Sequence, residues 1–222
     1  DWFIKQTSIP LPPNLKMREM KEEIVKRALE EFMHYGFKSF TMDDLAHKLG
    51  MSKKTLYELF PSKTDLVEST LDYVLQMTCK NIENFVQGEG SVIENVFRNE
   101  RTVQTTFNIK SGRPIWELQK YYSKTYERMD KEFIEADCLF VDKVMERGIQ
   151  EGLFREDINL KFFKIFYTAV QRMKAQSELF PETEFSFWET IYTIIEYFFR
   201  ILVNEKGLKE LERVLKEVKD KR

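Results

Sequence analysis

The sequence has few cysteines and no long apolar run, and both shortages exclude classes of protein. Its two cysteines, Cys79 and Cys138, are 59 positions apart among 222 residues, and neither belongs to a Cys-x-x-Cys or Cys/His cluster. A disulfide framework and a zinc site are therefore not expected, and both thiols are predicted to be reduced and buried. The most apolar run, Ile191 to Val203, is interrupted by Glu196 and Arg200. It falls short of the roughly 18 apolar residues that cross a bilayer.

The start of the chain lacks the basic segment and apolar block of a signal peptide. Together with the reduced thiols, this absence predicts a cytoplasmic protein that does not enter a membrane. Three prolines, Pro10, Pro12 and Pro13, predict an extended arm over residues 1–15. Met17 would make a natural start, so part of this arm is expected not to be native.

Net charge is −2, and this near-neutrality first argues against a nucleic-acid partner. The charge is unevenly distributed, however. Residues 16–66 carry ten Lys or Arg and nine Asp or Glu, whereas residues 67–222 carry 24 and 27. A weakly positive head on an acidic body is compatible with a protein that touches DNA at only a few phosphates.

Strand patterns, repeats and low-complexity tracts are also absent, and apolar residues recur at helical spacing instead. Ile24, Ala28 and Phe32 form one such stripe, which ends at Gly36 as a C-terminal cap. The predicted class is all-α, with a three-helix head at residues 16–63 and a helical body at residues 64–222. Body helices are expected over residues 66–87, 91–109, 114–126, 131–148, 157–178, 183–204 and 208–218.

The most informative stretch runs from Thr41 to Phe60. Thr41 with Asp44 resembles a capping box, Gly50 supplies a tight turn, and Ser52 caps a second short helix. Two short helices around a glycine turn predict a helix-turn-helix, whose second helix begins with Ser-Lys-Lys-Thr. This first turn is expected to meet base edges in the major groove of DNA.

The same stretch resembles the TetR family of transcription regulators over about 45 residues. The matching motifs are Phe32 to Gly36, Thr41 to Ala46, Gly50-Met51-Ser52, Thr55-Leu56-Tyr57, and Phe60 through Lys63 to Leu66. A connector from Gly148 to Asp157 is weakly similar to the family as well. The chain departs from the family at Lys54, where Gly or Ala is frequent.

The resemblance implies roles for residues at the matching positions. Thr41 and Ser52 would bind phosphates at helix N-termini. Lys53, Lys54 and Thr55 would reach base edges or the neighbouring backbone. Phosphates would also be bound by Tyr57 and Lys63.

The resemblance further implies a homodimer on a palindromic operator and a ligand cavity in the middle helices. The helices at about 157–178 and 184–204 would form the dimer surface as a four-helix bundle. A small apolar or amphipathic effector would release the protein, acting as a repressor, from its operator. Candidate cavity residues are Trp116, Tyr122, Tyr126, Met129, Phe133 and Met145, although aromatic stripes of this kind usually belong to a core.

Two other functions compete with this interpretation. One is a helical ligand-binding or scaffold protein whose DNA-binding head is vestigial. The other is an enzyme, which the sequence disfavours because Glu132, Glu135 and Asp137 look like a solvated helix face with no nucleophile, base or phosphate loop nearby. No catalytic residue, cofactor or metal site is expected.

Overall fold

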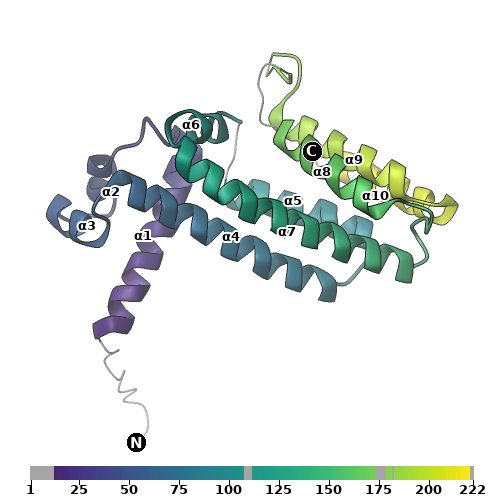
Figure 1. The fold of residues 1–222 in the computed structure, drawn as a ribbon, viewed down its shortest axis with the longest axis horizontal. Coiled ribbons are helices and arrows are strands. Elements are labelled where there is room, and N and C mark those ends of the chain that lie inside the picture. Colours follow the sequence, from purple (N-terminus) through teal and green to yellow (C-terminus); the bar gives the residue numbers. More distant parts are fainter. Residues whose placement is uncertain (1–12, 108–111, 174–178, 182, 221–222) are drawn as a thin grey trace, which may run out of the picture.

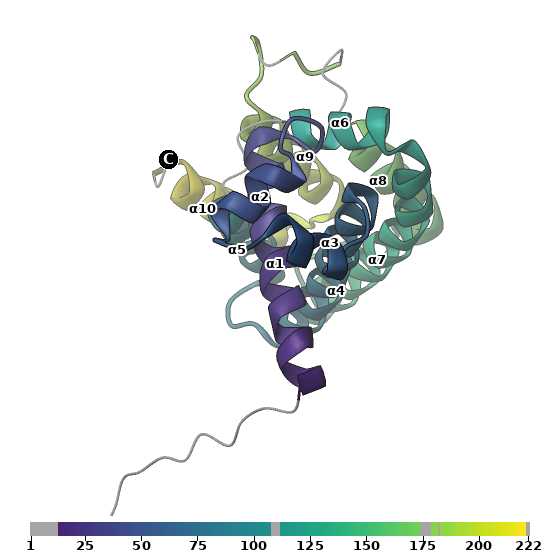
Figure 2. The ribbon, with the colours of Figure 1, turned by 90° about the vertical axis from the view of Figure 1, so that its left-hand side faces the viewer.

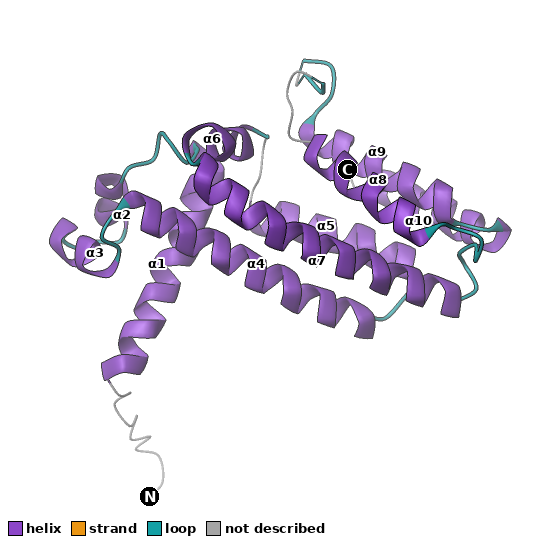
Figure 3. Cartoon of the chain, viewed as in Figure 1, coloured by secondary structure: helices purple, strands orange, loops and turns teal. Residues whose placement is uncertain are grey.

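A computed structural model describes residues 13–107, 112–173, 179–181 and 183–220. Within these ranges the chain is all-α, as predicted, and its only β pairing is one isolated bridge between Phe154 and Val203 (Figure 3). The helices are α1 (Pro13–Tyr35), α2 (Met42–Lys48), α3 (Lys53–Leu59), α4 (Lys63–Gln87), α5 (Val92–Phe107), α6 (Arg113–Tyr121), α7 (Ser123–Gln150), α8 (Leu160–Met173), α9 (Phe187–Leu202) and α10 (Glu205–Asp220).

The helices α1, α2 and α3 form a head at one end of the molecule (Figures 1 and 2). Phe32 of α1 stacks on Phe37, with ring centroids 4.9 Å apart, and Leu45 and Leu56 are fully buried beside them. The same hydrophobic cluster includes Leu66 of α4, Leu118 of α6 and Met129 of α7. The head therefore shares its core with the near end of the body instead of being a separate unit.

The body is built on α4 and α7, two long helices that pack side by side and lead away from the head (Figure 1). A second hydrophobic cluster lies at the far end, where α5, α7, α8, α9 and α10 meet. Phe97, Phe154 and Phe199 are central to it, with ring centroids 5.9 Å apart for both pairs that include Phe199. The two hydrophobic clusters therefore lie at opposite ends of α7, one beside the head and the other in the far part of the body.

The predicted boundary between the helices over 114–126 and 131–148 is wrong. The chain breaks at Tyr122, which ends α6 and begins α7 with non-helical torsions of φ −129° and ψ 39°. The Tyr122 hydroxyl donates to the carbonyl of Phe37 at 3.4 Å, and its ring meets the Phe37 ring edge-on. A contact 85 residues distant thus fixes the break, which local periodicity cannot reveal.

Three further helix starts differ from their predicted positions. Asp157 pairs with Arg155, and the side chain of Asn159 accepts the N–H of Phe162 at the start of α8 instead. Helix α9 begins after Ser186, whose capping box with Glu189 the sequence reasoning missed. Helix α10 includes Gly207, where a Cβ would lie 2.1 Å from the carbonyl oxygen of Leu153, so glycine is needed for close backbone packing.

The N-terminal arm is shorter than predicted, because α1 already begins at Pro13. Proline is well suited to the first turn of a helix, where its missing N–H has no helical partner to lose. Residues 1–12, and the predicted extension of the fifth body helix over 174–178, lie outside the described residues.

Candidate nucleic-acid interface and ligand cavity

The start of α2 is set by a complete capping box. The N–H of Asp44 donates to the Thr41 hydroxyl at 3.1 Å, and the N–H of Thr41 donates to the Asp44 carboxylate at 2.9 Å. The Thr41 hydroxyl and N–H lower the pKa of the Asp44 carboxyl. A lowered carboxyl pKa means that the cap contributes fully at neutral pH and weakens only as the pH falls through that lowered value.

The turn and α3 follow from two local features. Gly50 adopts φ +61°, and the N–H of Met51 donates to the carbonyl of Ala46 at 3.0 Å, which closes the turn. Ser52 caps α3 by accepting the N–H of Thr55 at 3.1 Å. Leu56 anchors α3 in the core, so the helix-turn-helix predicted from residues 41–60 is formed.

The outer face of α3 carries the exposed side chains predicted to meet DNA. Lys54 is the most exposed, with 87% of its side chain accessible, and Tyr57 is 45% exposed. The ammonium of Lys53 lies 2.5 Å from the carboxylate of Asp43 on α2. Both partners of this pair are exposed, so a phosphate can replace the carboxylate with little loss of free energy.

Three hydroxyls in the predicted set are already engaged within the protein. The Thr41 hydroxyl donates its proton to Asp44 at 2.6 Å, and the hydroxyls of Ser52 and Thr55 share a hydrogen bond of 2.8 Å. Thr41 can therefore donate its hydroxyl proton to a phosphate only by giving up its hydrogen bond to Asp44, while both bonds of the capping box stay in place. In the contact between Ser52 and Thr55 only one of the two hydroxyls donates, so the proton of the other hydroxyl remains available to a phosphate.

Lys63 lies at the N-terminus of α4 and contacts the loop before α2. Its ammonium donates to the carbonyl of Lys38 at 3.0 Å, which leaves two of its three protons free. Burial lowers the Lys63 pKa, against the opposing influence of the carboxylates of Glu117 and Asp44. Lys63 thus fixes the loop, a role that the sequence did not suggest.

Glu117 of α6 joins the body to the head. Its side chain is almost fully buried, accepts the N–H of Lys38 at 2.9 Å and pairs with Arg113 at 3.0 Å. Gly36, at φ +95°, makes room for it, because a Cβ there would lie 2.3 Å from a Glu117 carboxylate oxygen. Glycine at this position therefore allows both the turn that ends α1 and the close approach of Glu117 from α6.

Replacing Glu117 with leucine is expected to lower the free energy of unfolding by about 2 kcal/mol, since it leaves the N–H of Lys38 without its partner. Glu117→Gln retains an acceptor and should lose less than half as much. Chemical denaturation of the two variants tests this. Equal losses would show that the hydrogen bond to Lys38 contributes little.

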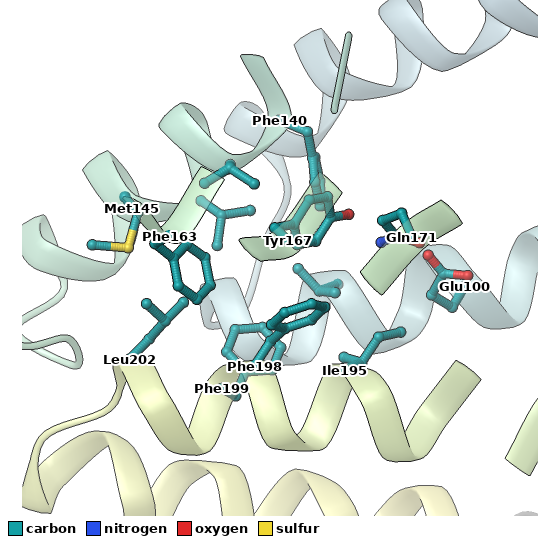
Figure 4. Close-up of a pocket in the computed structure, with 13 residues that line it drawn as sticks. Glu100, Phe140, Met145, Phe163, Tyr167, Gln171, Ile195, Phe198, Phe199 and Leu202 are labelled. Carbon is teal, nitrogen blue, oxygen red and sulfur yellow. The ribbon is translucent and has the colours of Figure 1, made fainter. Parts of the chain in front are cut away.

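The body contains an apolar cavity of about 50 Å³ between α5, α7, α8 and α9 (Figure 4). Its wall consists mainly of aliphatic and aromatic side chains, with polar groups at one end. The lining residues are Val96, Glu100, Phe140, Val141, Val144, Met145, Phe163, Tyr167, Gln171, Ile195, Phe198, Phe199 and Leu202.

Of the six predicted cavity residues, only Met145 lines this cavity. Trp116 is 41% exposed on α6, and Tyr122, Tyr126, Met129 and Phe133 pack in the core shared with the head. On α7 the nearest predicted aromatic residue, Phe133, comes seven positions before Phe140, which lines this cavity. The lining residues of α8 and α9 were instead assigned wholly to a dimer surface.

The outer faces of α8 and α9 carry an exposed apolar stripe. Phe162 and Ile165 of α8 are 68% and 62% exposed, and Tyr197 of α9 is 62% exposed. Phe198 packs against three aromatic rings of α8, so the two helices are direct neighbours. These helices are therefore apolar on two faces, one toward the cavity and one toward solvent.

Other chemistry is sparse in the part of the chain that the structure describes. No group of three or more His, Cys, Asp or Glu residues there could hold a metal ion. No helix among these residues combines the length and apolarity needed to cross a membrane. Cys79 is exposed and Cys138 half-buried, so the expectation of two buried thiols is wrong for Cys79.

A helix-turn-helix head with an exposed basic face, carried on a helical body, defines a DNA-binding transcription regulator. The family model described as bacterial regulatory proteins of the tetR family matches residues 24–70, which span α2, α3 and the flanking parts of α1 and α4. The head therefore belongs to the tetR family of bacterial regulatory proteins, and the relatives that share it are named as transcriptional regulators.

Relatives and solved structures agree with this assignment. An uncharacterized helix-turn-helix regulator of Bacillus subtilis, YvaF, is 28% identical and covers 81% of this chain and 94% of its own length. IcaR, a negative regulator of the biofilm operon of Staphylococcus epidermidis, is 23% identical over 55% of this chain and 80% of its own length. The SmeT–triclosan complex has the same fold, with a TM-score of 0.60 at 11% identity, covering 85% of this chain and 94% of SmeT.

Proposed function

We propose that the protein is a homodimeric repressor that binds a palindromic operator and is released from it by a small amphipathic effector. The observation that carries the proposal is the exposed face of α3, where Lys53, Lys54 and Tyr57 project from a helix anchored by Leu56. Lys53 and Lys54 would contact bases or phosphates, while Tyr57 and Lys63 would bind phosphates. Thr41, Ser52 and Thr55 would support them through helix N-termini and hydroxyls.

The dimer is supported by the stripe of exposed apolar side chains on α8 and α9. Contiguous apolar surface of this kind on a soluble domain marks an interaction site. Pairing these helices with their copies gives a four-helix bundle and two heads related by a two-fold axis. Such a dimer reads two half-sites about 34–36 Å apart, in successive major grooves of DNA in the cytoplasm.

Repression and release by an effector are supported by the relatives and by the cavity. IcaR is a negative regulator, and SmeT was solved with triclosan. The cavity of about 50 Å³ is far smaller than the roughly 300–1,000 Å³ of typical ligand sites. An effector would therefore enlarge it by moving a wall helix, and α7 and α6 would carry that movement to the head.

Selection of DNA fragments by the purified protein tests the proposal. The expected result is enrichment of a palindrome whose half-sites are centred about 10 base pairs apart or at a multiple of that spacing. No enriched palindrome from a folded, dimeric protein would contradict it.

The pair between Lys53 and Asp43 gives a further prediction. Asp43→Asn removes a negative charge beside α3 and frees Lys53, so it should tighten DNA binding about fivefold at low salt. The gain should shrink as salt is added, because both groups are exposed. Glu156→Gln, an equal charge change on the exposed connector of the body, should leave affinity unchanged, and an equal gain there would assign the effect to net charge alone.

A further inference from the structure

Both lysines at the start of α3 lie beside carboxylates, so the surface predicted to read DNA carries little net charge. The Lys53 ammonium is 2.5 Å from the carboxylate of Asp43, and the Lys54 ammonium is 4.0 Å from that of Glu58. All four side chains are more than half exposed. A carboxylate on such a surface is repelled by phosphates and lowers affinity for DNA in general. Affinity alone therefore does not explain these two carboxylates.

Asp43 is the carboxylate of α2 that is not used to build the head. Asp43 and Asp44 both lie in the first turn of α2, but Asp44 closes the capping box by accepting the N–H of Thr41. The Asp43 carboxylate instead reaches α3, where Lys53 is the first helical residue. Figure 2 shows α2 and α3 together at the head, facing the viewer. Asp43 thus belongs to the same outer surface as the lysines of α3.

The major groove of DNA offers few partners to a carboxylate. Its hydrogen-bond donors are the amino groups at cytosine N4 and adenine N6, while guanine O6, guanine N7 and thymine O4 only accept. A carboxylate placed against an acceptor loses its water and gains repulsion. Such a group penalises every sequence that lacks an amino group at the right position, and a penalty of this kind produces specificity.

The spacing of Lys53 and Asp43 matches the edge of one guanine–cytosine pair. Guanine O6 accepts a hydrogen bond from cytosine N4 within the pair, so this acceptor and this donor lie roughly 2.9 Å apart. With 2.5 Å between them, the ammonium of Lys53 and the carboxylate of Asp43 can bind these two base atoms without separating from each other. An adenine–thymine pair also has an amino group, but adenine leaves a lysine only one purine acceptor where guanine offers two.

Resting on the proposed function, we propose that Asp43 is a specificity-determining residue for the operator. While Lys53 binds guanine O6, the Asp43 carboxylate accepts the N–H of the paired cytosine N4 that faces the groove. On other sequences the same carboxylate meets an acceptor and opposes binding. Asp43 therefore lowers affinity for DNA of random sequence more than it lowers affinity for the operator.

Modified cytosines test this assignment without changing the order of the bases. N4-methylcytosine still pairs with guanine, but its methyl group replaces the N–H that faces the major groove. Each cytosine of the selected half-site is replaced in turn, in both half-sites, and affinity is measured by fluorescence anisotropy. At one position the wild-type protein should bind about tenfold more weakly than to the unmodified operator. The base 2-pyrimidinone, which lacks the amino group and adds no methyl, should weaken binding at the same position.

The variant Asp43→Ala removes both the charge and the acceptor. It should bind modified and unmodified operators equally, and its ratio of operator affinity to random-DNA affinity should fall about tenfold. Glu58→Ala removes an equal charge from the neighbouring pair on α3 and should keep the wild-type discrimination. Thermal unfolding identifies a variant that fails to fold. Asp43→Ser, whose side chain is shorter and carries no charge, then replaces Asp43→Ala.

The proposal is overturned if no cytosine shows this effect, if Asp43→Ala keeps the wild-type discrimination, or if Glu58→Ala loses it as well. A role of Asp43 only in starting α2, through the helix dipole, would lower the thermal stability of Asp43→Ala and leave the discrimination intact. Failure of the wild-type protein to select a palindrome would contradict the proposed function. Selection of a palindrome whose recognition does not depend on Asp43 would contradict only the present inference.

Discussion

The double variant Lys53→Ala with Tyr57→Ala is expected to lose at least about 100-fold in operator affinity. Each half-site loses one cationic contact and one hydroxyl contact, and a contact of this kind is worth about 1–3 kcal/mol. The loss is doubled because a dimer carries two copies of α3. Fluorescence anisotropy with the selected operator measures it.

The variant should fold normally, because neither side chain supports the core. Lys53 is exposed on the outer side of α3, and Tyr57 is 45% exposed. Lys209→Ala on α10 removes an exposed cation at the far end of the body and should leave affinity unchanged. Retained, salt-insensitive DNA binding by the double variant would instead support a vestigial head on a ligand-binding or scaffold protein.

The second large effect is expected from charges placed on the outer face of α8. Phe162→Glu with Ile165→Glu should convert the dimer to a monomer, because four carboxylates would face one another across the two-fold axis. Operator affinity should then fall by about 100-fold or more, since the gain from linking two heads is of order 10²–10⁴. Light scattering and anisotropy measure the two consequences separately.

A matched control is available on α7. Leu139 and Ile149 are also exposed, at 46% and 39%, but lie outside the stripe on α8 and α9. Leu139→Glu with Ile149→Glu should leave the protein dimeric and its operator affinity unchanged. The dimer interface would lie on another face of the body if this control became monomeric, or if the variant with two glutamates on α8 remained dimeric.

The head was predictable from the sequence because its determinants are local. Thr41 and Asp44 cap one helix within four residues, Gly50 turns the chain, and Ser52 caps the next helix. Spacing rules that operate over one helical turn are readable without knowledge of the tertiary fold. The all-α class and the position of α3 followed from the same rules.

The body was less predictable because its determinants are distant in sequence. The break at Tyr122 depends on Phe37, and the glycine within α10 depends on the backbone of Leu153. The joint between head and body depends on Glu117 reaching the loop that contains Lys38. None of these partners lies within helical spacing of the residue that it governs.

The cavity between α5, α7, α8 and α9 was not predicted, for a related reason. The aromatic residues from Tyr122 to Phe133 were predicted to line a cavity, yet they fill the core beside the head. A signal for this cavity was present in α9, where apolar residues occur all round the helix and indicate two buried faces. Assigning both faces to a dimer surface hid the residues that line the cavity, including Phe198 and Phe199.

The structure of the protein bound to its selected DNA tests the central claim most directly. The account predicts a two-fold dimer paired through α8 and α9, with the first turn of each α3 in a major groove. Lys53 and Lys54 should then lie at base edges or phosphates, and the two recognition helices should be about 34–36 Å apart. DNA bound by another surface, or by a single head without a symmetric partner, would contradict it.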